Sequence, residues 1–189
     1  MSRAGEAAID RGLKAVELLG SRYTALHVGV APYGERCFLG AFSEEFRRGA
    51  FTESLLAQPR IPLLLWHDSE TFPIGASDPY GWDDRLDGLY GRFELLLTSV
   101  AQYAASLVDE QVLTGASIGF VPLASEWRPV ADAEWDPTLG ADHVDTVVRT
   151  AARLVEVSLT ATPAYLGALV TGIESEPVGD QIPSMELAG

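Results

Sequence analysis

Three side chains of the kinds that cooperate in acyl transfer lie beside or within strand-like stretches of this sequence: His67, Ser117 and Glu156. A serine hydroxyl is a poor nucleophile until a neighbouring imidazole takes its proton. The imidazole in turn needs a carboxylate that fixes its tautomer and stabilises its positive charge. In the order His, Ser, Glu, the sequence therefore offers a base, a nucleophile and an orienting acid.

Ser117 also lies in a glycine pattern that suggests different chemistry. Residues 115–119 read GASIG, which matches the G-x-S-x-G nucleophile elbow of α/β-hydrolases. An elbow needs a strand before the serine and a helix after it, whereas the pattern here predicts the opposite order. It would also require His143 as the base, within a charged, insertion-like segment. An α/β-hydrolase-like esterase that uses Ser117 and His143 is therefore the second hypothesis.

The other reactive side chains carry less evidence. His27 lies in the middle of a predicted strand without a polar constellation around it, and we expect it to be structural. Cys37 is the single cysteine, so it cannot form an internal disulfide, and we expect a buried, inert thiol. No two histidines, and no histidine and cysteine, lie at ligand spacing. The sequence therefore predicts neither a metal site nor a cofactor.

The charge of the chain limits its partners. The 189 residues include 13 basic and 27 acidic side chains, which gives a net charge of −14. Nucleic acids and anionic membranes are bound through basic surfaces, so neither is expected as a direct partner. No apolar run approaches the length of a membrane span, and residues 1–20 fit neither a signal peptide nor a transit peptide. We therefore expect the protein to remain in the compartment where it is made.

The chain divides into one main domain with flanking segments. Apolar residues at helical spacing predict a peripheral helix over 4–19, within an N-terminal segment 1–22. Residues 23–170 carry the patterns of a single domain, which includes an acidic extension at 126–145. The segment 171–189 contains four acids, no base and two prolines, and we expect a disordered tail.

Strand-like stretches, recognised by apolar alternation and bounding turn residues, surround the candidate residues. They are 23–31, 36–42, 61–67, 72–77, 85–95, 117–127, 144–149 and 152–164. The first two are expected to pair, and Ser43 is expected to begin a helix. Thr98 or Ser99 begins the clearest amphipathic helix, whose apolar stripe includes Val100 and Tyr103. Without regular β-α-β alternation, these elements predict an α+β fold, a mainly antiparallel β-barrel surrounded by short helices.

Glu156 lies in a strand-like stretch of mostly apolar residues. Strict alternation predicts that Leu154 and Ser158 share the face of Glu156, while Val155 and Val157 point the other way. A carboxylate in such surroundings needs a partner.

From about residue 23 to residue 168, the chain resembles the HK97-type prohead maturation proteases of tailed phages, which are related in fold to the herpesvirus assemblins. The resemblance rests on five motifs in the family's order. They are GAFTESL (49–55), LLLWHDSETFPIGAS (63–77), GLYGRFELLLTS (88–99), TGASIGF (114–120) and LVEVSLTATPAYLGA (154–168).

The resemblance implies that His67 is the catalytic histidine, Ser117 the nucleophile and Glu156 the acidic third member of a triad. These are the residues that the chemistry selects independently. The resemblance further implies a serine endopeptidase that works in the host cytoplasm, inside the assembling prohead. Its substrates would be the major capsid protein, the scaffold, and often the protease itself. Assemblins are activated by dimerisation, so the resemblance leaves oligomerisation open.

The chain departs from assemblins at the oxyanion site. Assemblins have an arginine pair after their third catalytic residue, whereas the last arginine here, Arg153, precedes Glu156. We therefore expect backbone N–H groups near Ser117, or in the loop after Glu156, to stabilise the oxyanion. A third hypothesis is a catalytically inactive, capsid-internal scaffold module that keeps the fold.

Overall fold

The computed structural model describes residues 21–131 and 133–177 of the chain. Strands dominate it, accompanied by two α-helices and two 3₁₀ turns, η1 and η2. The elements are β1 (Ser21–Pro32), β2 (Cys37–Phe38), β3 (Ser43–Phe46), α2 (Thr52–Ala57), β4 (Pro62–Leu65), β5 (Gly75–Asp84), β6 (Gly88–Leu95), α3 (Ser99–Asp109), β7 (Gly115–Arg128), η1 (Pro137–Leu139), η2 (Ala141–His143), β8 (Thr146–Thr160) and β9 (Val170–Pro177). The expected strand-rich α+β class is confirmed.

The strands form one mixed sheet in the order β2-β3-β8-β4-β5-β6-β1-β9, with β7 paired to β8 outside this path. β8 pairs in parallel with β3 and β4, and the other pairs are antiparallel. The sheet is open, so the predicted β-barrel is wrong, although most of the strand pairs are antiparallel as predicted. Strands neighbouring in sequence, such as β4, β5 and β6, do pair in antiparallel fashion. The parallel partners of β8 are instead about a hundred residues away, and local patterns carry no signal for such pairing.

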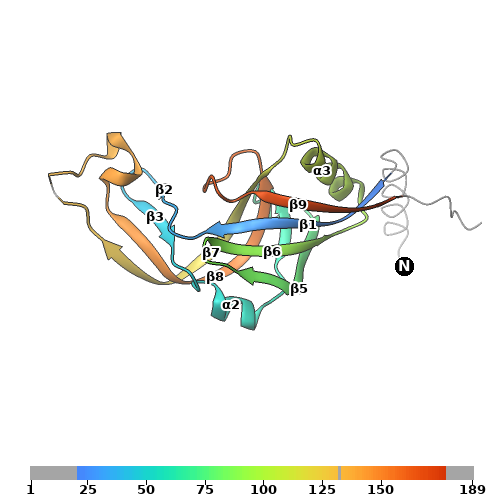
Figure 1. The fold of residues 1–189 in the computed structure, drawn as a ribbon, viewed down its shortest axis with the longest axis horizontal. Coiled ribbons are helices and arrows are strands. Elements are labelled where there is room, and N and C mark those ends of the chain that lie inside the picture. Colours follow the sequence, from blue (N-terminus) through green and yellow to red (C-terminus); the bar gives the residue numbers. More distant parts are fainter. Residues whose placement is uncertain (1–20, 132, 178–189) are drawn as a thin grey trace, which may run out of the picture.

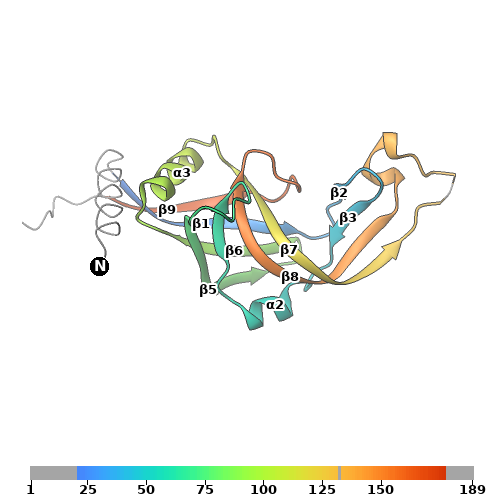
Figure 2. The same ribbon diagram turned by 180° about the vertical axis from the view of Figure 1, so that it is seen from behind.

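The molecule has a body and a projecting arm (Figures 1 and 2). The body contains β1, β4, β5, β6 and β9, with α2 and α3 at separate places around the sheet. The arm consists of the far ends of β7 and β8, and β2 and β3 lie beside it. The described residues of the acidic segment, 126–131 and 133–145, lie toward the tip of this arm and include η1 and η2 (Figure 1).

Several local predictions need correction. The stretches 23–31 and 36–42 do not pair, because β1 lies between β6 and β9. Ser43 begins strand β3 rather than a helix, since its two acids are buried and bind arginines of β7 and β8. The tail prediction is wrong for residues 171–177, which belong to β9 and pair with β1. Residues 178–189 and the predicted helix over 4–19 lie outside the described residues.

The predicted amphipathic helix is present as α3, and its buried face matches the predicted stripe in part, since Ala104 and Val108 are buried. Thr98 is its N-cap, as predicted, and the threonine hydroxyl accepts a hydrogen bond from the Ala101 N–H at 3.2 Å. Small residues such as Ala101 and Ala104 face the protein, while Val100 and Tyr103 are 57% and 64% exposed. Tight packing against the sheet therefore favours the alanine face over the larger apolar side chains.

The core lies on the inner face of the sheet and supports β8. Phe46 contacts the rings of Phe51, Phe120 and Tyr165, with centroids 4.9–5.5 Å apart. Val157 and Leu159 of β8 are fully buried in the same cluster. Apolar burial of this kind is the main stabilising contribution to the fold, and it fixes β8 firmly between β4 and β7.

Candidate active site

His67 lies in a tight turn directly after β4. Trp66 and His67 have φ values of 53° and 58°, in the left-handed region that side chains other than glycine rarely adopt. The Asp68 N–H donates to the Leu65 carbonyl at 3.0 Å. Two positive φ values within such a hydrogen-bonded turn are features of a type I′ turn. The turn brings His67 back to the edge of β8.

The imidazole of His67 contacts the carboxylate of Glu156. His67 Nδ1 lies 2.6 Å from Glu156 Oε1. The glutamate is only 8% exposed, whereas the histidine side chain is 44% exposed. A carboxylate accepts hydrogen bonds, so the contact assigns the ring proton to Nδ1 and leaves Nε2 free to accept a proton.

A β-bulge turns Glu156 toward His67. Across the β7–β8 ladder, Gly119 faces Glu156 and Phe120 faces Leu154, so Val155 is an extra residue in β8. Leu154 is buried in the core, while Val155 is 38% exposed. The prediction that Leu154 shares the face of Glu156 is therefore wrong, because the bulge interrupts the alternation between them.

Ser158 joins the same cluster and was not selected from the sequence. It is fully buried, it accepts a hydrogen bond from the His67 N–H at 3.0 Å, and it donates one to Glu156 Oε2 at 2.7 Å. The available signal was its position two residues after Glu156 in a strand with buried apolar neighbours. A hydroxyl there must find partners.

Ser117 lies on the other side of β8 from His67. It faces Ser158 directly across the antiparallel ladder, and it is half-buried. Side chains directly opposite each other have Cβ atoms about 4.5–5.5 Å apart and point to the same face. Within the described residues, the hydrogen bonds of His67 go to Glu156 and Ser158, and none reaches Ser117. Nucleophile–base hydrogen bonds are often long before substrate binds.

The second hypothesis fails on this geometry. Ser117 lies inside β7, which continues to Arg128, so the serine is not at a strand-to-helix elbow. His143 belongs to η2 in the arm, where its Nδ1 lies 3.3 Å from the Glu134 carbonyl oxygen. At about 3.3 Å per residue, the strand between Ser117 and the arm tip is roughly 35 Å long. His143 is too distant to act as the base for Ser117.

The other reactive side chains, His27 and Cys37, lie outside the His67–Glu156 cluster. His27 Nε2 lies 2.7 Å from Glu174 Oε1 on the exposed face of the sheet. Cys37 is a buried free thiol, as predicted, and burial together with nearby Glu44 and Glu35 raises its pKa. In residues 21–131 and 133–177, no three His, Cys, Asp or Glu side chains gather as a metal site would require. None of the helices in these ranges is long and apolar enough to span a membrane.

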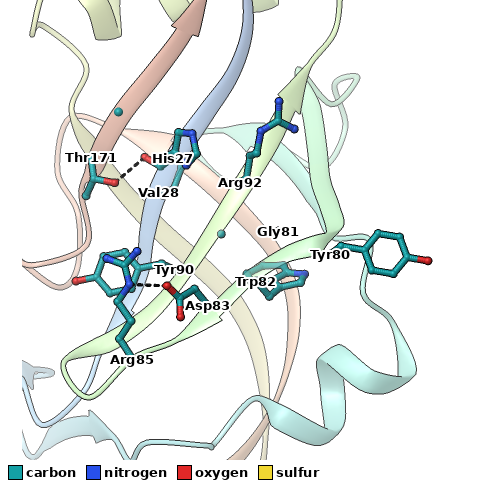
Figure 3. A pocket seen from close by; sticks show the side chains of 12 residues that line it. His27, Val28, Tyr80, Gly81, Trp82, Asp83, Arg85, Tyr90, Arg92 and Thr171 are labelled. Atoms are coloured by element: carbon teal, nitrogen blue, oxygen red, sulfur yellow. Dashed lines mark hydrogen bonds and ion pairs between the residues drawn. The ribbon is translucent and has the colours of Figure 1, made fainter.

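A pocket of about 500 Å³ lies away from the His67–Glu156 pair, over β1, β5, β6 and β9 (Figure 3). Both arginines of the pocket lining are paired with acids. Arg85 pairs with Asp83 at 2.7 Å, and Arg92 forms two hydrogen bonds with Glu174. Carboxylates therefore balance the arginine charges, and the Thr171 hydroxyl donates to the backbone carbonyl of His27 rather than to its imidazole.

A search of curated proteins found no match to this chain. A comparison with protein families gave one, described as caudovirus prohead serine protease, and it covers residues 31–179. This range contains all three candidate catalytic residues and most of the described structure. The match confirms the resemblance inferred from the five motifs. The chain is thus a serine protease of prohead maturation and belongs to the caudovirus prohead serine protease family.

Proposed function

We propose that this prohead protease is a serine endopeptidase in which Ser117 is the nucleophile, His67 the general base and Glu156 the orienting acid. The 2.6 Å contact between His67 and Glu156 carries the proposal, because it leaves Nε2 as the basic atom on the face where Ser117 lies. A buried carboxylate paired with a half-exposed imidazole is the arrangement that this chemistry requires.

The reaction follows from these positions. His67 Nε2 accepts the Ser117 hydroxyl proton as Oγ attacks the carbonyl carbon of the peptide bond. The imidazolium, stabilised by Glu156, then gives this proton to the leaving amine, and an acyl-enzyme ester forms. A water molecule then attacks the ester, and His67 accepts a proton from this water. The acid product leaves, and the proton returns to Ser117 Oγ.

The oxyanion needs donors, and the edge of β7 that faces away from β8 offers a backbone N–H group. The Ala116 N–H donates to the Ala168 carbonyl at 2.8 Å, so it points away from β8. Because N–H groups alternate between the two sides of a strand, the N–H of Ile118 faces the same outer edge, immediately after the nucleophile. We assign Ile118 as the first donor to consider for the developing negative charge.

The proposed substrates are the major capsid protein and the scaffold inside the assembling prohead, in the host cytoplasm, with the protease itself as a further substrate. Membership of the prohead serine protease family supports this class of substrate.

The test is co-expression of the full chain with its cognate capsid protein. Ser117→Ala should leave the capsid protein uncut, since loss of the nucleophile costs on the order of 10⁴ to 10⁶ in turnover. Ser125→Ala is the matched control, because Ser125 lies in the same strand and its hydroxyl accepts a hydrogen bond from Arg149, away from His67 and Glu156. A fluorophosphonate probe should label the wild-type protein at Ser117. Normal trimming by Ser117→Ala would overturn the proposal, and absence of labelling would favour the scaffold module.

A further inference from the structure

Ser158 connects the elements that carry the three proposed catalytic residues. It belongs to β8 with Glu156, it faces Ser117 across the ladder, and its hydroxyl binds the backbone of His67. The hydroxyl uses its one proton for Glu156 Oε2 and a lone pair for the His67 N–H. It is fully buried, so water cannot replace either bond.

The turn that carries His67 needs external support. Its two consecutive positive φ values are unfavourable for Trp and His, and such strain persists only where surrounding contacts hold it. β8 supplies two of these contacts. The Trp66 N–H donates to the Leu159 carbonyl at 3.0 Å, and the His67 N–H donates to Ser158 Oγ at 3.0 Å. The second contact depends on a side chain, and a substitution can therefore remove it.

We infer that Ser158 is a positioning residue for the proposed triad. It holds the His67 backbone and the second oxygen of Glu156 with a single hydroxyl, which fixes the imidazole between the acid and Ser117. It acts through His67 and Glu156 and does not touch substrate. This inference rests on the proposed function.

Removal of the hydroxyl should slow the chemistry more than it harms the fold. Ser158→Ala leaves the His67 N–H unpaired and deprives Glu156 Oε2 of its donor, so we expect Ser117 to react with a fluorophosphonate probe roughly 10- to 100-fold more slowly. Ser158→Cys keeps the connectivity of the side chain, but its larger sulfur offers only a weak donor, and it should also be slow. Ser158→Thr retains the hydroxyl and should restore most of the rate.

Ser77 provides a matched control. It is also fully buried, it accepts from the Ile61 N–H at 2.8 Å, and it donates to the Pro59 carbonyl at 2.9 Å. Ser77→Ala therefore removes an equivalent pair of hydrogen bonds without touching the triad. It should lower the melting temperature as Ser158→Ala does, yet leave the labelling rate of the folded protein unchanged.

The readouts are the labelling rate of the full chain, its melting temperature, and the ¹⁵N NMR signal of His67 Nδ1. We expect this signal to change in Ser158→Ala and to recover in Ser158→Thr. Wild-type labelling in Ser158→Ala would overturn the positioning role. If Ser158→Ala does not fold, a wild-type labelling rate in Ser158→Cys would overturn the positioning role instead. If the wild-type chain itself is not labelled at Ser117, the proposed function fails instead.

Discussion

Gly119 faces Glu156 across the β7–β8 ladder, and the glutamate carboxylate occupies the space that a side chain at position 119 would need. A Cβ atom there would lie 2.5 Å from Glu156 Oε1. At the other end of the GASIG pattern, a Cβ on Gly115 would lie 2.5 Å from the Thr160 carbonyl oxygen. Both glycines therefore permit close packing of two antiparallel strands. A pattern that matches a nucleophile elbow arises here from a different physical constraint.

We predict that Gly119→Ala displaces the Glu156 carboxylate from His67. Misplacement by about 1 Å can cost roughly 100-fold in rate, so labelling of Ser117 should fall by about that factor. Gly172→Ala is the control, because its Cβ would come no closer than 3.6 Å to any neighbour. The measurement is the rate of fluorophosphonate labelling for both variants. Equal rates would show that the Glu156 position is not constrained by Gly119.

Glu156→Gln should retain the packing of the side chain but lose the negative charge that stabilises the imidazolium. The amide can also hold the imidazole in the wrong tautomer, and we expect a loss of roughly 10² to 10⁴ in turnover. Cleavage of the co-expressed capsid protein reports this loss. Asp142→Asn, an exposed acid in the arm, serves as the control. A fully active Glu156→Gln protein would exclude Glu156 from the triad.

His143→Ala should leave cleavage unchanged, because His143 lies in the arm, where its Nδ1 is 3.3 Å from the Glu134 carbonyl oxygen. This variant tests the esterase alternative directly. The same co-expression assay applies, with His67→Ala as the inactive reference. Loss of cleavage in His143→Ala together with activity in His67→Ala would reverse the assignment of the base.

The carboxylate of Glu174 should stabilise the fold in a pH-dependent manner. Hydrogen bonds from Arg92, with a further one from His27, lower its pKa from 4.5 to about 2. A group with a lowered pKa in the folded state stabilises fully above its unfolded pKa, and this contribution is lost as the pH falls toward the folded pKa. Glu174→Gln should therefore lower the melting temperature at pH 7, by a modest amount because the side chain is partly exposed.

The difference in melting temperature between wild type and Glu174→Gln should narrow between pH 4.5 and about 2. Added salt should also reduce it at pH 7, because these side chains are accessible to ions. Thermal unfolding followed by circular dichroism measures both effects. A difference that is constant across this pH range would mean that the Arg92 and His27 contacts do not stabilise the charged form.

Much of the fold was predictable where signals are local. The amphipathic helix with its Thr98 cap and the strand that ends before His67 follow from apolar spacing and turn residues over short windows. The buried face of α3 followed only in part from that spacing, because Val100 and Tyr103 are exposed. Small side chains pack closest to the sheet, and the identity of the surface that α3 meets lies elsewhere in the sequence.

The chemistry of His67, Ser117 and Glu156 is determined by the sequence itself, because side-chain type sets which residue can donate, accept or attack. Their arrangement is decided by the tertiary structure. The contact between His67 and Glu156 needs parallel pairing of β4 with β8, a left-handed turn and a bulge at Val155. Each of these depends on contacts between segments far apart in the chain. The proposed role of Ser158 depends on them as well, since its hydroxyl accepts from the His67 N–H only when the turn after β4 closes over β8.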